Sequence, residues 1–118
     1  MGLYMTQARF TSTTWRHMTK SPSDRRRAVE KLMKAHGGKL LHFYWSFGDH
    51  DVVAIYQTPD HRAALAALMT IAAGGAVTET RTTVLIENAD AMKAMGKAGS
   101  TKSGYSVPGR LAGRAKDG

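Results

Sequence analysis

The sequence predicts one α+β domain in which two helices lie on one face of a four-stranded antiparallel sheet. The chain has 118 residues, 42% of them hydrophobic, which is enough for a single domain with its own core. Four segments have the apolar, aromatic and β-branched composition of strands. Two other segments repeat apolar residues at helical spacing, and together the segments follow the order βαββαβ.

The four strands are expected over residues 3–10, 39–47, 51–57 and 76–87. Each of these segments lacks an internal breaker, and the second and third are apolar or aromatic on both faces. A Gly-Asp-His turn at residues 48–50 joins the second and third strands as a hairpin. Because both of these strands are apolar on both faces, we expect both faces of the sheet to be covered.

The first helix is expected to begin at residues 21–24, after a turn and a short polar segment that contains Trp15. In this start Ser21 acts as the cap, Pro22 suits the first helical position, and Asp24 supplies the carboxylate of a capping box. Apolar positions then recur at the spacing of one helix face: Val29, Leu32, Met33 and His36. The pair Gly37 and Gly38 ends the helix by supplying a positive φ angle.

The second helix is expected after the turn at residues 58–60, where Asp60 caps it. Its predicted buried stripe is Leu65, Leu68, Met69 and Ala72, and a second glycine pair closes it. A short third helix, capped by Asn88 and ended by Gly96, is expected after the last strand.

This element order is that of the split βαβ, or ferredoxin-like, plan. In that plan the helices leave one sheet face open, and Leu40, Tyr44, Val53 and Ile55, or their neighbours of opposite parity, must face it. A monomer would expose a large apolar patch there, whereas two sheets packed face to face would bury it. We therefore expect the chain to pair with itself as a homodimer.

The formal charge of +8 divides equally between a domain over residues 1–96 and a tail over residues 97–118. The tail is rich in Gly and Ser and poor in large apolar residues, so we expect it to be disordered. A basic tail could bind nucleic acid or an anionic surface. Because its basic residues are spaced out, we favour a solubilising role and see no strong case for nucleic acid.

The composition also limits location and chemistry. No apolar run is long enough for a membrane span, and the first residues lack a signal-peptide core, so the cytoplasm is the expected compartment. The absence of cysteine excludes disulfides, thiolate metal sites and thiol nucleophiles. The sequence contains no phosphate-binding loop, dinucleotide fingerprint, nucleophile elbow or HExxH motif.

The candidate catalytic residues are His50, His42 and Asp51, and the histidines are also the candidate metal ligands. His50 lies between Asp49 and Asp51, where it could act as a base, although the same residues suit a hairpin turn, which we favour. His42 is expected to lie at the same sheet end as His61. Two histidines make a poor metal site without a further carboxylate, so we expect no metal and no cofactor.

Two groups are candidate ligand-binding residues. If the last strand lies beside the first, Arg9, Glu79 and Arg81 could bind a small anion, or they could form ordinary cross-strand ion pairs. The aromatic run that ends in Tyr44 and Trp45 could stack on a ligand, or it could pack in the core or a dimer interface.

The hairpin carries a family resemblance. The run Tyr44-Trp45-Ser46-Phe47-Gly48-Asp49-His50-Asp51 resembles the Y-W-[ST]-x-G-x-Y-D signature of the GYD domain family. Lys20-Ser21-Pro22, Pro59-Asp60 and Val77-Thr78-Glu79-Thr80 are similar to further segments of that family, and the resemblance covers about residues 3–95. Two residues depart from the pattern: His50 replaces the motif tyrosine, and Trp15 stands where a small residue is usual.

The resemblance implies a dimeric α/β barrel, in which ferredoxin-like domains pair through their sheets, and it implies no established reaction. Of the motif residues, it suggests turn geometry for Gly48 and turn or cap hydrogen bonds for Asp51. The expected function is a homodimer with a pocket for a small molecule. The alternatives are a cofactor-free or haem-using oxygenase or isomerase with His50 or His42 as base, and a nucleic-acid or anionic-surface binder through the tail.

Overall fold

The computed structural model describes residues 1–109, which fall into two compact units, Met1–Ile86 and a second that begins at Glu87. In the first unit the strands are β1 (Gly2–Phe10), β2 (Lys39–Trp45), β3 (Val52–Thr58) and β4 (Val77–Leu85). Its helices are α1 (Ser12–Lys20), α2 (Arg25–Ala35) and α3 (His61–Ala73). The second unit holds α4 (Asn88–Ser100).

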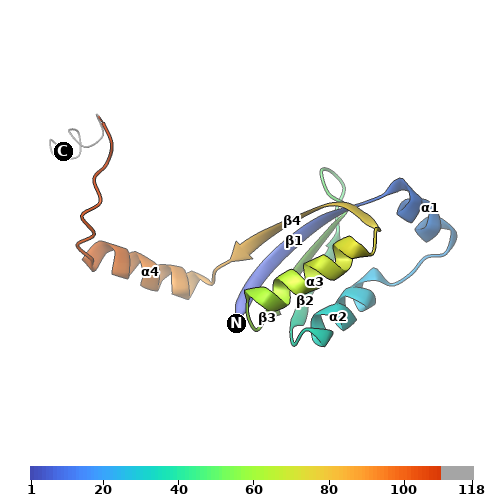
Figure 1. Cartoon of the computed structure of the whole chain (residues 1–118), viewed down its shortest axis with the longest axis horizontal. Coiled ribbons are helices and arrows are strands. Elements are labelled where there is room, and N and C mark those ends of the chain that lie inside the picture. The colour runs from blue at the N-terminus through green and yellow to red at the C-terminus, as the bar shows by residue number, and fades with distance from the viewer. Residues whose placement is uncertain (110–118) are drawn as a thin grey trace. The chain divides into compact units, whose positions relative to one another are not determined.

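The four strands form one antiparallel sheet in the order β2-β3-β1-β4. Figure 1 shows α2 and α3 side by side over the same face of this sheet. The predicted α+β, ferredoxin-like fold is thus confirmed. Strand β4 lies beside β1, as expected, with Arg9 opposite Glu79 and Gln7 opposite Arg81.

Helix α1 occupies a stretch for which the sequence predicts only a turn and a polar segment. Thr11 caps the helix by accepting a hydrogen bond from the backbone N–H of Thr14 at 3.0 Å. The β-branched residues of the first turn have low helix propensity, and no residue of α1 is buried. The ring of Trp15 packs edge-on against Phe10 at 5.9 Å between centroids, so tertiary packing stabilises a helix that local preference does not predict.

Helix α2 begins at Arg25, later than predicted. Asp24 is itself the N-cap, since its Oδ1 accepts a hydrogen bond from the backbone N–H of Arg27 at 3.0 Å. Ser21 instead ends α1, where its backbone N–H bonds to the carbonyl of His17. The predicted positive φ angle after the helix is confirmed at Gly37, which has φ 75°.

The buried face of α3 differs from the predicted stripe. Asp60 caps the helix as expected, but the buried residues are Ala64 and Ala67, while Leu65 and Met69 are 53% and 60% exposed. The helix is apolar on nearly every face, so its periodicity does not define a single stripe. Small alanines let the helix approach the sheet. Of the larger residues in the predicted stripe, Leu68 lines the cavity between helix and sheet, whereas Leu65 and Met69 are exposed.

A bulge in β2 changes which side chains face the helices. Leu40 lies opposite Tyr56, but it is His42, two residues on, that lies opposite Ile55. One extra residue reverses the alternation of the strand. Leu40 is therefore buried beneath the helices, contrary to its expected place on the open side, whereas Tyr44 lies opposite Val53 on that side.

The sheet separates a core from an uncovered surface. The buried cluster lies between sheet and helices and consists of Tyr4, Met33, Leu40, Ala54, Tyr56, Ala64 and Ala67. The side chains of opposite parity form what we call the open face: Leu3, Met5, Gln7, Arg9, His42, Tyr44, Val53, Ile55, Gln57, Glu79, Arg81, Thr83 and Leu85.

The second unit contains a longer helix than predicted. Helix α4 passes through Gly96 and ends at Ser100, with Met92 and Met95 exposed on it. The expected disorder of residues 97–118 stays a prediction, and residues 110–118 lie outside the described residues.

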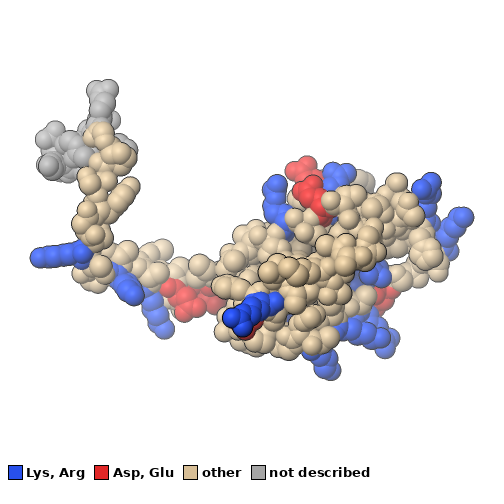
Figure 2. Space-filling view, in the orientation of Figure 1, with Lys and Arg blue, Asp and Glu red and all other residues tan. Residues whose placement is uncertain are grey.

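Two properties of the described residues bear on partners. No helix within residues 1–109 combines the length and the apolar character that crossing a bilayer requires. Lys and Arg are dispersed in separate groups over the face of the first unit seen in Figure 2, as the spread of charge in the sequence indicates.

Candidate ligand cavity

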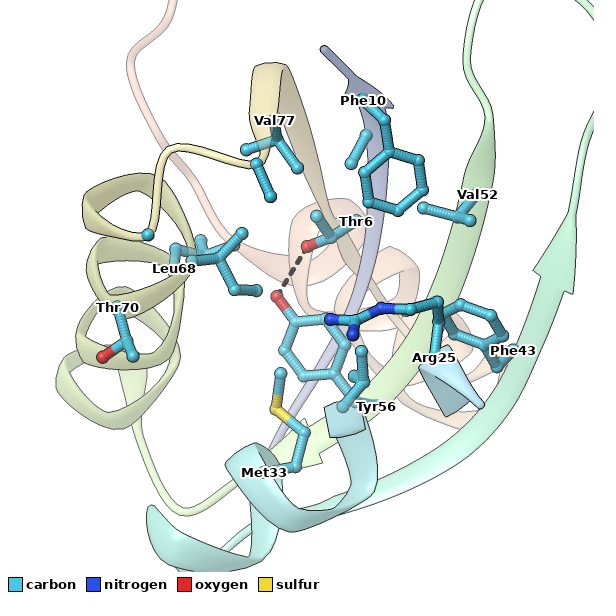
Figure 3. A pocket seen from close by; sticks show the side chains of 16 residues that line it. Thr6, Phe10, Arg25, Met33, Phe43, Val52, Tyr56, Leu68, Thr70 and Val77 are labelled. Carbon is cyan, nitrogen blue, oxygen red and sulfur yellow. Dashed lines mark hydrogen bonds between the residues drawn. The ribbon is translucent and has the colours of Figure 1, made fainter. Parts of the chain in front are cut away.

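An apolar cavity of the first unit lies between the sheet and the two helices α2 and α3. Its volume is about 250 Å³. Most of its lining is apolar, and Figure 3 shows side chains converging on it from both helices and from the sheet. Its walls include Thr6, Phe10, Arg25, Val29, Ala54 and Tyr56.

Hydroxyl groups form the polar part of the sheet side. The Tyr56 hydroxyl lies 2.7 Å from Oγ1 of Thr6, which lies 2.9 Å from Oγ1 of Thr82. Tyr56 is completely buried, and this burial raises the pKa of its hydroxyl above 10.0, against the smaller opposing effect of its hydrogen bonds to Thr6 and Thr82. The phenol therefore stays protonated at neutral pH and acts as a neutral hydrogen-bonding group.

Arg25 is the only charged residue of the cavity lining within the described part of the chain. It is the first residue of α2, and in Figure 3 its side chain extends in the direction of Tyr56. Its side chain is half-buried, and no carboxylate of residues 1–109 forms a salt bridge with it. Arg25 thus brings an uncompensated positive charge to a mainly apolar space.

Aromatic rings close the end of the cavity near Phe10. The ring centroids of Phe10, Trp15 and Trp45 lie 5.8–5.9 Å from one another. Phe43 lies edge-on to Trp45 at 6.2 Å, and both Phe10 and Phe43 line the cavity. Trp15, which stands where the family pattern has a small residue, therefore has a structural role, since its ring joins α1 to the ends of β1 and β2.

His50, the first candidate base, is placed away from this cavity. It is 8% exposed, and its Nε2 lies 3.2 Å from Oε1 of Glu79. It borders a shallow depression that also involves Asp49 and Arg81. In the described residues Glu79 forms no salt bridge with Arg9 or Arg81, so the cross-strand ion pairs considered from the sequence are replaced by a contact with His50.

His42 and His61 do not meet. His42 stacks on Tyr44, with ring centroids 6.1 Å apart, on the open face. His61 bonds through Nδ1 to the hydroxyl of Tyr4 at 2.8 Å, on the side of the helices. Nowhere in residues 1–109 do three His, Asp or Glu side chains come together in a way that could hold a metal ion.

The hairpin motif has a structural explanation at Asp51. Its Oδ2 accepts a hydrogen bond from the backbone N–H of Phe10 at 2.8 Å, where the register between β1 and β4 shifts. The carboxylate thus satisfies a donor that lies beyond the last pair of the ladder between β1 and β3, Ala8 opposite Val52. Gly48, by contrast, has no positive φ angle, and a Cβ added there would meet open space.

The other candidate ligand-binding residues lie outside the cavity. Tyr44 is 58% exposed on the open face, together with Arg9 and Arg81. Trp45 belongs to the aromatic cluster and borders only a shallow depression beside α1.

Sequence reasoning missed Arg25, Tyr56 and Thr6 as a group. A signal for Arg25 was present, because three consecutive arginines occupy the first turn of a helix, where the helix dipole disfavours positive charge. Tyr56 and Thr6 carry no such signal, since tyrosine and threonine are ordinary strand residues.

The fold and the cavity together define a class: a small ferredoxin-like domain with an internal space between sheet and helices. The model of the GYD domain family matches residues 4–95. The chain therefore belongs to the GYD domain family, as its hairpin motif predicts.

Solved structures with a similar fold have low sequence identity. The crystal structure of MtbAldR has a TM-score of 0.54 at 14% identity over 74% of this chain, which spans only 53% of that protein. The crystal structure of TTHA0845 from Thermus thermophilus has a TM-score of 0.50 at 16% identity, covering 74% of this chain and 95% of the other. At these identities the similarity concerns the fold alone. None of the curated proteins compared with this chain matches it.

Proposed function

We propose that this GYD-domain protein binds a small, mainly apolar molecule in the cavity between its sheet and helices, and that it works as a homodimer paired through the open face. The observation that supports binding is the cavity of about 250 Å³, whose walls are formed mainly by apolar side chains of α2, α3 and the sheet. Ligand sites in proteins are typically apolar concavities with a few placed polar groups.

The make-up of the cavity wall favours binding over catalysis. Among the described residues its lining includes no histidine and no carboxylate, and its phenol, Tyr56, has a raised pKa. A general base needs a group that loses its proton near neutral pH and reaches the substrate. The candidate bases His42 and His50 lie elsewhere, so the oxygenase or isomerase alternative receives no support from this cavity.

The open face supports self-association. It presents Leu3, Met5, Tyr44, Val53 and Ile55 on one sheet surface that neither α2 nor α3 covers (Figure 1). Burial of such a surface is favourable at roughly 25 cal/mol per Å² of apolar area. A chain without cysteine needs no oxidising compartment, which supports a cytoplasmic place of work.

A cavity-filling substitution tests the binding proposal. Ala54 is a buried lining residue of β3, so Ala54→Leu adds bulk inside the cavity, whereas Ala73→Leu adds the same bulk at an exposed position of α3. We expect hexanol and benzyl alcohol to give saturable amide shifts at Val29 and Tyr56 in NMR titrations of the wild type and Ala73→Leu, and none in folded Ala54→Leu. Shifts that survive in Ala54→Leu, or no saturable shifts in the wild type, would contradict the proposal.

A further inference from the structure

We propose that the natural ligand of this cavity is a small monocarboxylate with an apolar body, whose carboxylate pairs with the guanidinium of Arg25. This inference rests on the proposed function, since it names the chemical class of the molecule that the cavity binds. It depends on where Arg25 lies, on what surrounds it and on the size of the space beside it.

Arg25 lies at the boundary between the cavity and the surface. It lines the cavity and also borders a second, more open depression lined by Thr11, Thr14 and His17. A ligand that enters from this depression would bring its apolar part into the cavity and leave its head group beside Arg25. The geometry therefore orients an amphipathic molecule with its polar end outward.

Within residues 1–109 the charge of Arg25 has no counter-ion, whereas the charge of its neighbour Arg26 has one. Arg26 forms an i,i+4 salt bridge with Glu30 at 3.0 Å, and Arg27 is exposed to water. Arg25 is half-buried beside apolar walls, where a charge loses hydration without a partner within the described residues. Its place at the first position of α2 adds an unfavourable interaction with the helix dipole. A bound anion would offset both effects.

The chemistry of one arginine selects a carboxylate. A guanidinium donates two parallel hydrogen bonds to a carboxylate in a planar, bidentate arrangement. A single positive charge matches a monoanion, whereas phosphate groups carry nearly two charges at neutral pH. None of the cavity's lining residues in the described chain is a second cation.

The volume limits the size of the apolar body. A space of about 250 Å³ holds about eight groups of the size of water, at ~30 Å³ each. Acids of about six to eight carbons fit this space, and Val29, Met33, Leu68 and Ile71 would contact their chains.

Matched ligands test the inference on the unmodified protein. Hexanoate, hexanamide and hexylamine share one apolar body and differ in the charge of the head group. By isothermal titration or NMR titration we expect hexanoate to bind at least about tenfold more tightly than hexanamide, as charge-assisted hydrogen bonds predict. Hexylamine should bind more weakly than both.

Two variants with the same change in net charge locate the effect. Arg25→Met removes the guanidinium beside the cavity, and Arg27→Met removes one that is exposed on the same helical turn. We expect Arg25→Met to bind hexanoate and hexanamide about equally, and Arg27→Met to keep the preference for hexanoate. Arg25→Lys, which keeps the charge and loses the bidentate fork, should show an intermediate preference.

The outcomes separate this inference from the proposed function. Equal binding of hexanoate and hexanamide by the wild type would overturn the carboxylate inference and leave the binding cavity in place. A preference that persists in Arg25→Met would overturn it as well. No binding of any of the three ligands, nor of hexanol, would overturn both the inference and the proposed function.

Discussion

The Tyr56 hydroxyl lies 2.7 Å from Oγ1 of Thr6, so two neighbouring strands share a hydrogen bond between side chains inside the core. Tyr56→Phe keeps the ring and removes this bond. We expect a loss of about 1 kcal/mol in the free energy of unfolding, since Thr6 retains its contact with Thr82. Chemical denaturation followed by circular dichroism measures it. Tyr105→Phe, at an exposed position outside the first unit, is the control and should change nothing.

The raised pKa of Tyr56 predicts a dependence of stability on pH. Burial raises this pKa in the folded state above its ordinary value of 10.0, while the unfolded state keeps that value. Below pH 10 both states bind the proton and stability is unaffected. Above it the unfolded state releases the proton first, so stability falls as pH rises. Between about pH 9 and 11 Tyr56→Phe should lose less stability than the wild type, and an equal loss would count against the assignment.

The strands of the sheet could be predicted from the sequence because strand composition and turn residues are local features of the chain. Strands β1 to β4 and the cap at Asp60 follow from nearby residues, and the position of Arg9 opposite Glu79 follows from the strand order of the ferredoxin-like plan. The assignment of Asp24 was incomplete, since it caps α2 itself and Ser21 does not. Such boundary differences arise because Ser21 and Asp24, three positions apart, are both of residue types that can cap a helix.

What the sequence could not predict depends on contacts between distant residues. Helix α1 exists because Trp15 reaches Phe10 and Trp45, and no local pattern reports those contacts. The bulge after Leu40 reverses which side chains of β2 face the helices. A register shift of one residue does not change the amino-acid composition of the strand, so the sequence does not reveal it. A pocket was expected, but its lining could not be predicted for the same reason, since Arg25 and Tyr56 come to line one cavity only through the packing of α2 on the sheet.

The hydrogen bond from the backbone of Phe10 to Asp51 predicts a structural role for this motif residue. Asp51→Ala leaves a backbone N–H without its partner, which costs about 1–3 kcal/mol when the group is shielded from water. Asp51→Asn keeps an acceptor oxygen and should lose less. Asp49→Ala, an exposed neighbour in the same turn, is the matched control. Equal melting temperatures for Asp51→Ala and Asp49→Ala would show that the hydrogen bond between Phe10 and Asp51 contributes nothing to stability.

Two glycines in different connecting segments, Gly38 and Gly48, should respond differently to alanine. A Cβ at Gly38 would collide with the carbonyl oxygen of Gln57, since this residue joins α2 to β2 close to strand β3. We expect Gly38→Ala to destabilise the protein by about 1–3 kcal/mol, as overpacking does. Gly48→Ala, in the motif hairpin, meets open space at a φ angle that alanine tolerates and should be neutral. Equal urea midpoints for the two variants would be the contrary result.

The proposed homodimer makes the final prediction. If two open faces pack together, Val53 on the central strand β3 lies in the interface, and Val53→Glu places a charge there without a partner. Size exclusion with light scattering should give the wild type twice the chain mass of 12.8 kDa and folded Val53→Glu a single chain mass. Leu65→Glu, an equally drastic change at an exposed position of α3, should remain dimeric because the helices lie on the opposite side of the sheet. A monomeric wild type at micromolar concentration, or a monomeric Leu65→Glu beside a dimeric Val53→Glu, would refute pairing through the open face.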